Sequence, residues 1–261
     1  MKRLTHLSLF SGIGGLDLAA EWAGIQTVGQ CEWAEYPAKV LEKHWPDVPR
    51  WKDIRTLTGE SFYERTGRRT VDIISGGFPC QPFSVAGKRR GKEDDRYLWP
   101  EMLRVIQEIK PKWVVGENVS GLIRGALADI LSDLEGAGYE ARAYTSEARN
   151  VGGVFRGERI AVVAASYNWS TFMRGNGKFS ANGEIEGGWN NNRAGKEKPD
   201  LWERWQIESR PYGVADGVPY RVDRLKCLGN AVVPQQFYPI FKAIAEIAEQ
   251  TKGERRWIQK Q

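Results

Sequence analysis

The hydrophobic and polar positions of the first two thirds of the chain follow two periods in turn. Short apolar runs rich in β-branched residues predict strands at 4–10, 27–32, 71–75, 113–117 and 160–165. Between these runs, apolar residues recur at helical spacing and predict helices at 16–23, 37–43, 98–109 and 122–135. This alternation indicates an α/β fold, a doubly wound parallel sheet with helices on both faces.

The pattern changes after residue 165. Residues 167–221 hold eight glycines, six asparagines and nine aromatics without a sustained period. Order returns near residue 225, and 235–247 is predicted to be an amphipathic helix before a basic tail. We therefore expect three units: a main domain at 1–165, a small irregular region at 166–222, and a segment at 223–261 that completes the main domain.

Composition narrows the class of protein. The chain has 261 residues, 41% of them hydrophobic, which is enough for a core and excludes disorder. No apolar run approaches the roughly 20 residues that span a bilayer, so we expect no membrane or secretory segment. The net charge of +5 permits a polyanionic partner without requiring one.

The cysteines and histidines indicate a reducing compartment. Cys31, Cys80 and Cys227 are too few for a disulfide framework and share no metal-ligand spacing with His6 and His44. We therefore expect a cytoplasmic protein without a metal site.

The first candidate site is a glycine-rich turn. Residues 10–16, Phe-Ser-Gly-Ile-Gly-Gly-Leu, lead from the first strand into the first helix. Such a turn lets backbone amides at a helix N-terminus approach a ligand, and Glu32 follows at the end of the next strand, where a carboxylate can bind ribose hydroxyls. The turn favours a nucleotide-like cofactor, and an ordinary tight turn is the alternative.

The second candidate site is a cysteine after the third predicted strand. Cys80 lies between Pro79 and Gln81, and several basic residues between 88 and 96 would lower the pKa of its thiol and attract phosphates. The alternative is a buried structural thiol.

The third candidate site is a carboxylate at the end of the fourth predicted strand. In a cleft of low dielectric constant, Glu117 would have a raised pKa and could donate a proton near neutral pH. A helix N-terminal acid is the alternative.

Taken together, these motifs resemble the DNA cytosine-5 methyltransferase family, in a compact bacterial or phage-type form. The matching blocks follow the family's order from residue 7 to 239, and they lie at 10–15, 32–33, 53–54, 77–81, 117–119, 157–160, 224–225 and 229–232. The resemblance implies a Rossmann-like sheet that uses S-adenosylmethionine, releases S-adenosylhomocysteine, and carries a small target-recognition region at 166–222.

The resemblance also implies a role for each matched residue. Cys80 would be the nucleophile, Glu117 the proton-holding acid and Arg159 a ligand of the base, with Asn118 supporting the reactive loop and Pro79 directing the cysteine. Expected cofactor contacts are Phe10, Gly12, Ile13, Gly14, Gly15, Leu16, Glu32, Trp33, Asp53, Ile54, Leu98 and Asn230. Expected DNA contacts are Gln81, Ser84, Lys88, Arg89, Arg90, Arg96, Arg174 and Arg193.

One position departs from the family's pattern. The family commonly has a second arginine two residues before the catalytic one, and Gly157 stands there in this chain. The small recognition region and this glycine leave open a catalytically lapsed DNA-binding protein. An RNA cytosine-5 methyltransferase and a dinucleotide-dependent oxidoreductase are further alternatives, although the oxidoreductase leaves Cys80 and Glu117 unexplained. The expected partner is double-stranded DNA, the expected state a monomer, and an accompanying restriction endonuclease stays open.

Overall fold

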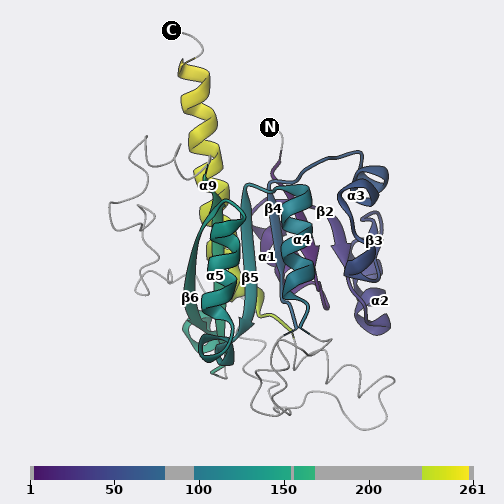
Figure 1. Cartoon of the computed structure of the whole chain (residues 1–261), viewed down its shortest axis with the longest axis vertical. Coiled ribbons are helices and arrows are strands. Elements are labelled where there is room, and N and C mark those ends of the chain that lie inside the picture. Colours follow the sequence, from purple (N-terminus) through teal and green to yellow (C-terminus); the bar gives the residue numbers. More distant parts are fainter. Residues whose placement is uncertain (1–2, 80–96, 154–155, 168–230, 259–261) are drawn as a thin grey trace.

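A computed structural model describes residues 3–79, 97–153, 156–167 and 231–258. In this part of the chain, strands form a sheet of seven in the order β3-β2-β1-β4-β5-β7-β6 (Figure 1). The strands are β1 Thr5–Leu9, β2 Gln26–Cys31, β3 Arg50–Trp51, β4 Ile73–Gly76, β5 Trp113–Val119, β6 Tyr139–Glu147 and β7 Glu158–Ser166. The α-helices are α1 Gly15–Trp22, α2 Glu35–His44, α3 Gly59–Thr66, α4 Trp99–Ile109, α5 Leu127–Gly136 and α9 Pro234–Ile258, with 3-10 turns η1 Ile54–Thr56, η4 Ser120–Arg124 and η5 Ala148–Val151.

Two layers of helices cover the sheet, as the doubly wound α/β prediction requires. Apolar residues of α3, α4 and α5 pack with one sheet face, and those of α1 and α9 pack with the other (Figure 1). Alternate residues of a strand point to opposite faces, so Val114 lies in the first core and Val115 in the second. Because both faces are buried, the alternation of side chains along each strand also determines toward which face a polar side chain at the strand end points.

The strand order reverses between β1 and β4. The chain runs outward from β1 to β2 and β3, then returns to pair β4 with the other side of β1. Ligands of open α/β sheets bind at such a reversal, beyond the carboxyl ends of the strands. The glycine turn follows β1 and the Cys80 segment follows β4, so both motifs begin at this point.

The five predicted strands are confirmed, but the sheet is not wholly parallel as expected. β7 runs antiparallel to both β5 and β6. The sequence pattern carries no sign of strand direction, because a buried strand is apolar in either orientation. As a result, the beginning of β7 lies at the same sheet edge as the carboxyl ends of β4 and β5.

Two strands and one α-helix of the described residues were not predicted. β3 has two residues, and β6 is an edge strand whose exposed positions give it no clear apolar alternation. The helix α3 buries one residue, Phe62, and owes its start to a capping box between Thr58 and Ser61. A two-residue strand, a half-exposed strand and a helix with one buried residue contribute few regularly spaced apolar residues, so a prediction from apolar spacing misses them.

The C-terminal helix is longer than predicted. It was expected at 235–247, whereas α9 runs from Pro234 to Ile258 and packs on α1.

Nearly all of the expected recognition region lies outside the described residues. None of the described helices combines the length and apolarity needed to cross a membrane.

Candidate active site

The glycine turn after β1 is built from left-handed backbone. Gly12 and Gly14 have φ angles of +55° and +89°, and Phe10, a non-glycine residue, has a φ of +51°. The turn closes with a hydrogen bond from the Gly14 amide to the Ser11 carbonyl, 2.9 Å. A Cβ on Gly12 would meet nothing within 4 Å, so Gly12 faces open space.

The next two glycines are required by packing. A Cβ on Gly14 would lie 2.5 Å from the Trp45 ring, and one on Gly15 would collide with the Val232 carbonyl. Glycine lets backbone approach this closely, which brings the segment before α9 against the turn. The expected access of a ligand to the backbone therefore applies to Gly12. Gly14 and Gly15 must be glycine because a side chain there would collide with Trp45 or Val232.

Glu32 contacts the turn directly. Its Oε2 accepts a hydrogen bond from the Gly12 amide at 2.8 Å, and its Oε1 accepts one from the Ala34 amide at 2.7 Å. The neighbouring Trp33 is 65% exposed, with the Lys52 ammonium 5.9 Å from its ring centre. Trp33 is therefore available to a ligand rather than part of the core.

The other expected cofactor residues differ in accessibility. Leu16 and Ile54 are each 3% exposed and pack in the two cores, so they could meet a ligand only through backbone. Asp53 caps η1 by accepting a hydrogen bond from the Arg55 amide. Leu98 is half-buried before α4.

Glu117 is a buried carboxyl paired with an arginine. It is 9% exposed, and its Oε1 lies 2.9 Å from Arg159 Nε. In the β5–β7 register Glu117 pairs with Ala161 and Val119 with Arg159, so the two charged side chains are diagonal neighbours on one sheet face. Burial raises the pKa of Glu117 to about 7, although the charge of Arg159 and its hydrogen bond act in the opposite direction.

Backbone next to the Cys80 segment lies against this carboxyl. A Cβ on Gly77 would stand 2.8 Å from Glu117 Oε2. The neighbouring Asn118 donates a hydrogen bond from Nδ2 to the Phe78 carbonyl at 3.0 Å, while its Oδ1 accepts one from the Val119 amide. Asn118 thus holds the chain two residues before Cys80, and Pro79 follows half-buried.

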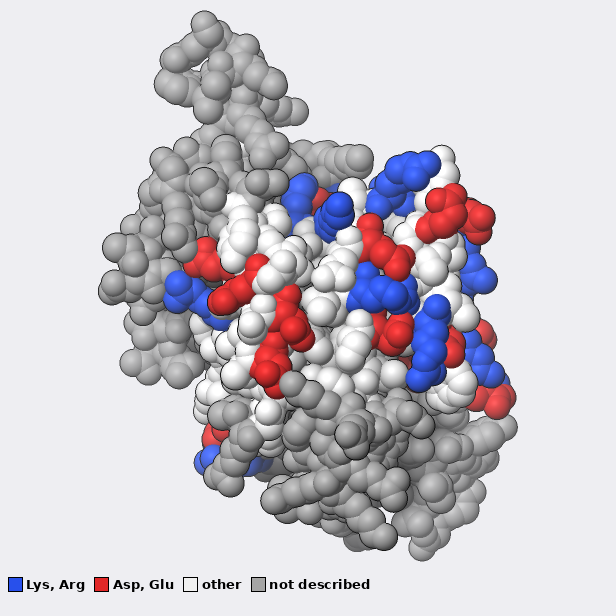
Figure 2. Space-filling model, viewed as in Figure 1, with Lys and Arg blue, Asp and Glu red and all other residues white. Residues whose placement is uncertain are grey.

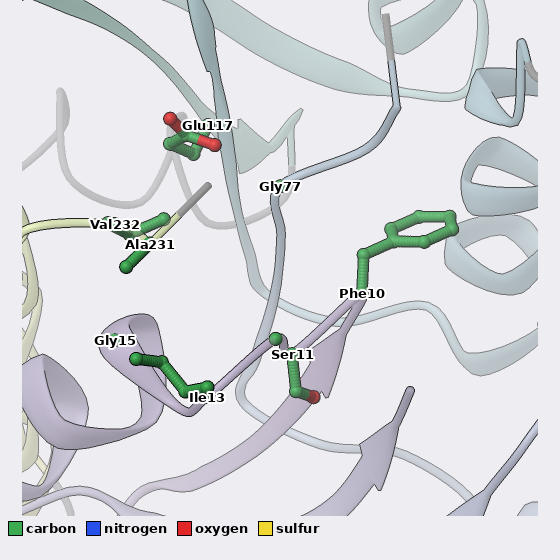
Figure 3. A pocket seen from close by; sticks show the side chains of 9 residues that line it. Phe10, Ser11, Ile13, Gly15, Gly77, Glu117, Ala231 and Val232 are labelled. Carbon is green, nitrogen blue, oxygen red and sulfur yellow. The ribbon is translucent and has the colours of Figure 1, made fainter. Parts of the chain in front are cut away.

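A hollow connects these parts. It has about 280 Å³ of empty space, part of it open to solvent. Figure 3 shows Glu117 and Gly77 on one side, Ile13 and Gly15 on another, and Val232 between them. The full lining is Phe10, Ser11, Gly12, Ile13, Gly15, Gly77, Glu117, Ala231 and Val232.

Several expected site residues lie outside the described part of the chain. They are Cys80, Gln81, Ser84, Lys88, Arg89, Arg90, Arg96, Arg174, Arg193 and Asn230.

Two buried polar residues near the site were not predicted. Asp17, beneath the turn, accepts hydrogen bonds from Ser8 Oγ at 2.8 Å and Gln30 Nε2 at 2.9 Å, and burial raises its pKa to about 6. Gln236 is 1% exposed on α9. Each occupies a position that helical spacing assigns to the apolar face, and this mismatch is the signal that could have identified them.

Comparison with known proteins agrees with this arrangement. The profile of the family described as C-5 cytosine-specific DNA methylase matches residues 4–203. The chain belongs to this family. It is 32% identical over 183 residues to the type II methyltransferase M.BsuFI of Bacillus subtilis, and 41% identical over 140 residues to M.PspPI of Psychrobacter sp..

Each of these matches covers a larger share of this chain than of the relative. The stretches shared with M.BsuFI and M.PspPI are 67% and 51% of this chain but 43% and 32% of those proteins, so the chain spans less than half of either relative. Two solved structures are similar in fold to this chain. Spodoptera frugiperda DNMT2 (a mutant) has a TM-score of 0.62 at 14% identity, covering 92% of this chain and 99% of its own. Entamoeba histolytica methyltransferase EhMeth has 0.63 at 16%, covering 94% and 99%.

Among the residues that the structure describes, the face that carries α3, α4 and α5 shows no continuous basic track for a DNA backbone. Acidic side chains gather over α5, which carries Asp129, Asp133 and Glu135, and both signs of charge are interleaved over α3 and α4 (Figure 2). Phosphate contacts need clustered lysine or arginine. The described residues of this face therefore do not supply the clustered cations that phosphate contacts need.

A methyl group on Gly77 tests how closely the site around Glu117 is packed. We expect Gly77→Ala to displace the Glu117 carboxyl, because its Cβ would stand 2.8 Å from Oε2. Misplacement of a reacting group lowers turnover by about 10-fold to 100-fold. Methyl transfer would be measured beside Gly136→Ala, whose Cβ meets nothing within 4 Å. Equal activity of the two variants would contradict the prediction.

The departure at Gly157 has a backbone consequence. Its φ of +46° is left-handed, so Gly157→Arg would strain the chain just before Arg159. We expect the free energy of unfolding to fall by about 1 kcal/mol or more. Urea denaturation would show the same loss for Gly157→Ala, since the cause is the backbone and not the charge. A loss confined to the arginine variant would refute this explanation.

Proposed function

We propose that this chain is a DNA (cytosine-5) methyltransferase, which transfers a methyl group to carbon 5 of a flipped cytosine in a short DNA sequence. The observation that carries the proposal is the pair of the buried Glu117 and the half-buried Arg159, at the end of the sheet where the Cys80 segment leaves β4. A buried carboxyl with a pKa of about 7 can hold a proton near neutral pH. The pair thus offers a proton donor and a cation to one planar ring.

The residues around the hollow fit S-adenosylmethionine. Gly12 opens the turn toward free space, and the exposed Trp33 offers a flat face to an adenine. Glu32 is fastened to the turn by the Gly12 amide, and its oxygens have lone pairs left for ribose hydroxyls. When bound, S-adenosylmethionine supplies the methyl group as an electrophilic sulfonium.

The chemistry begins with Cys80. Carbon 5 of cytosine is a poor nucleophile, so the Cys80 thiolate adds to carbon 6, and the electron pair of the 5,6 double bond becomes available at carbon 5. Carbon 5 takes the methyl group, loses its proton to a base, and the electrons of that bond expel the Cys80 thiolate. The thiolate is regenerated, and the other products are the methylated cytosine, neutral S-adenosylhomocysteine and one proton, which carries the positive charge of the former sulfonium.

Glu117 and Arg159 stabilise the charge that develops on the ring. Glu117 donates its proton in a hydrogen bond to ring nitrogen 3, and Arg159 binds the oxygen at carbon 2. Asn118 maintains the backbone at Phe78, so the cysteine that follows Pro79 keeps its direction. Glu117 and Asn118 lie on β5 and Arg159 lies on the neighbouring strand β7, so two adjacent strands carry these groups.

A cytosine in a stacked duplex cannot reach this hollow. We therefore propose base flipping, with residues 81–96 closing over the extruded base. Contacts of Lys88, Arg89, Arg90 and Arg96 with phosphates would make DNA binding sensitive to salt. The protein would act as a cytoplasmic monomer, with or without a partner endonuclease.

The decisive test is tritium transfer from labelled S-adenosylmethionine. We expect incorporation into duplex DNA and little into tRNA. Preferred labelling of tRNA would favour an RNA methyltransferase. No labelling by a folded protein that binds the cofactor would favour a lapsed DNA-binding member.

A further inference from the structure

A buried amide ties the C-terminal helix to the arginine-bearing strand. Gln236 lies in the first turn of α9, and its Nε2 donates hydrogen bonds to the Ser146 carbonyl at 2.9 Å and the Gly157 carbonyl at 3.0 Å. Because both partners are carbonyls, the amide must direct its nitrogen toward them. One side chain thus connects the end of β6 with the residue before β7.

Both carbonyls are close to Arg159 along the strands. Ser146 is the register partner of Arg159 in the β6–β7 pair, and Gly157 precedes Arg159 by two residues. Gly157 also accepts a hydrogen bond from the Ala148 amide, 3.3 Å. The two bonds of Gln236 therefore restrain the part of the hairpin from which the Arg159 side chain extends.

Packing alone does not explain an amide at this position. The neighbours of Gln236 on the buried face of α9 are apolar, namely Phe237, Ile240, Phe241 and Ile244. Within the described residues, Gln236 Oε1 is buried without a hydrogen-bond partner. An apolar side chain would avoid that unpaired oxygen, so the two bonds from Nε2 are what the amide contributes.

We propose that Gln236 is a positioning residue, which holds the start of β7 so that Arg159 meets Glu117 and the cytosine. This inference rests on the proposed function and adds α9 to the parts that set the site. The segment before Gln236 also reaches the glycine turn, because the Val232 carbonyl lies against Gly15. The beginning of α9 thus contacts both the cofactor turn and the arginine strand.

The other charged groups around Glu117 have partners of their own. At the hairpin end, Glu147 pairs with Arg149 and Arg156, and Glu158 lies 3.8 Å from Arg156. On the turn side, Glu32 accepts two backbone amides. From α1, Asp17 is bound to Ser8 and Gln30. Among the described residues, Arg159 is the cation that contacts Glu117, so a displaced Arg159 should be visible in the titration of Glu117.

The test replaces the amide by a side chain of similar length. Gln236→Met removes the donor, and Gln236→Glu places oxygens opposite the two carbonyls. Gln235→Met changes the half-buried neighbour and serves as the control. Carbon-13 NMR of labelled glutamate carboxyls, with the Glu117 signal assigned from Glu117→Gln, reports the titration without turnover.

We expect the pKa of Glu117 to shift upward in both Gln236 variants, because burial remains while the arginine moves away. Methyl transfer should fall by about 10-fold, and the control should change neither quantity. Combining Gln236→Met with Arg159→Met should shift the pKa no further than Arg159→Met alone, since both changes act through one arginine.

Other outcomes would overturn the inference. A loss of stability with an unchanged Glu117 titration would make Gln236 merely structural. If Gln236→Met does not fold, Gln236→Glu gives the same reading. Failure of the proposed function is distinguishable, because it would appear as absent methyl transfer in the unaltered protein, whereas the NMR titration needs no activity.

Discussion

Replacement of Cys80 by serine should abolish methyl transfer while cofactor binding persists. The serine hydroxyl is a far weaker nucleophile than a thiolate, and loss of a covalent nucleophile costs on the order of 10⁴-fold or more. The backbone leading to residue 80 should be unaffected, because Phe78 is 3% exposed, packs on Trp99 at 5.2 Å between ring centres, and accepts the Asn118 bond. Bisulfite sequencing of DNA from expressing cells would measure the loss and would also show the recognition sequence.

A second cysteine in the chain supplies the control for this variant. Cys31 is 2% exposed, and burial raises the pKa of its thiol to about 12, which makes it a poor nucleophile. Cys31→Ala should therefore retain methyl transfer. Calorimetry should give equal affinities for S-adenosylmethionine in Cys80→Ser and the unaltered protein. Turnover by Cys80→Ser would remove Cys80 from the nucleophile role.

Replacement of Glu117 by glutamine should lower the rate by about 10²-fold to 10⁴-fold, the usual contribution of a general acid. DNA affinity should change little, because the side chain meets the base only after flipping. Filter binding and single-turnover methylation would separate these quantities. A comparable loss of affinity would make Glu117 a binding or structural residue.

The same carboxyl should determine a pH dependence. The reaction needs neutral Glu117, so the rate of the unaltered protein relative to Glu117→Gln should fall as the pH rises through about 7. Taking this ratio at each pH cancels the effect of groups that titrate in both proteins. The folded state also binds a proton that the unfolded state releases between pH 4.5 and about 7, so the stability contribution of Glu117 declines as the pH rises through that window. A ratio independent of pH would contradict the assigned proton.

Local sequence predicted most of the sheet, and the exceptions have physical causes. Strands β1, β2, β4, β5 and β7 are mostly buried, and the apolar residues that this burial selects gave the spacing that predicted them. The edge strand β6 is half exposed and gives a weak pattern. Strand direction leaves no mark on apolar spacing, so the antiparallel β7 was expected to be parallel.

For the candidate site too, some features were visible in the sequence and others only in the tertiary structure. The motifs around Gly12, Cys80, Glu117 and Arg159 are short runs of particular residue types, which the sequence displays directly. Why Gly14 and Gly15 must be glycine was not visible, because Trp45 and Val232 approach from distant parts of the chain. Gln236 was overlooked for the same reason, since its partners lie 79 and 90 residues away.

By itself, then, the sequence determined the family and the order of its motifs, because those depend on residue identity within short segments. Only the tertiary structure decided the state of the site. The pKa of Glu117 depends on how far folding removes it from water and on Arg159, which reaches it only because β7 is antiparallel. Burial and the distance between charges are properties of residues brought together by folding, and no local pattern records them.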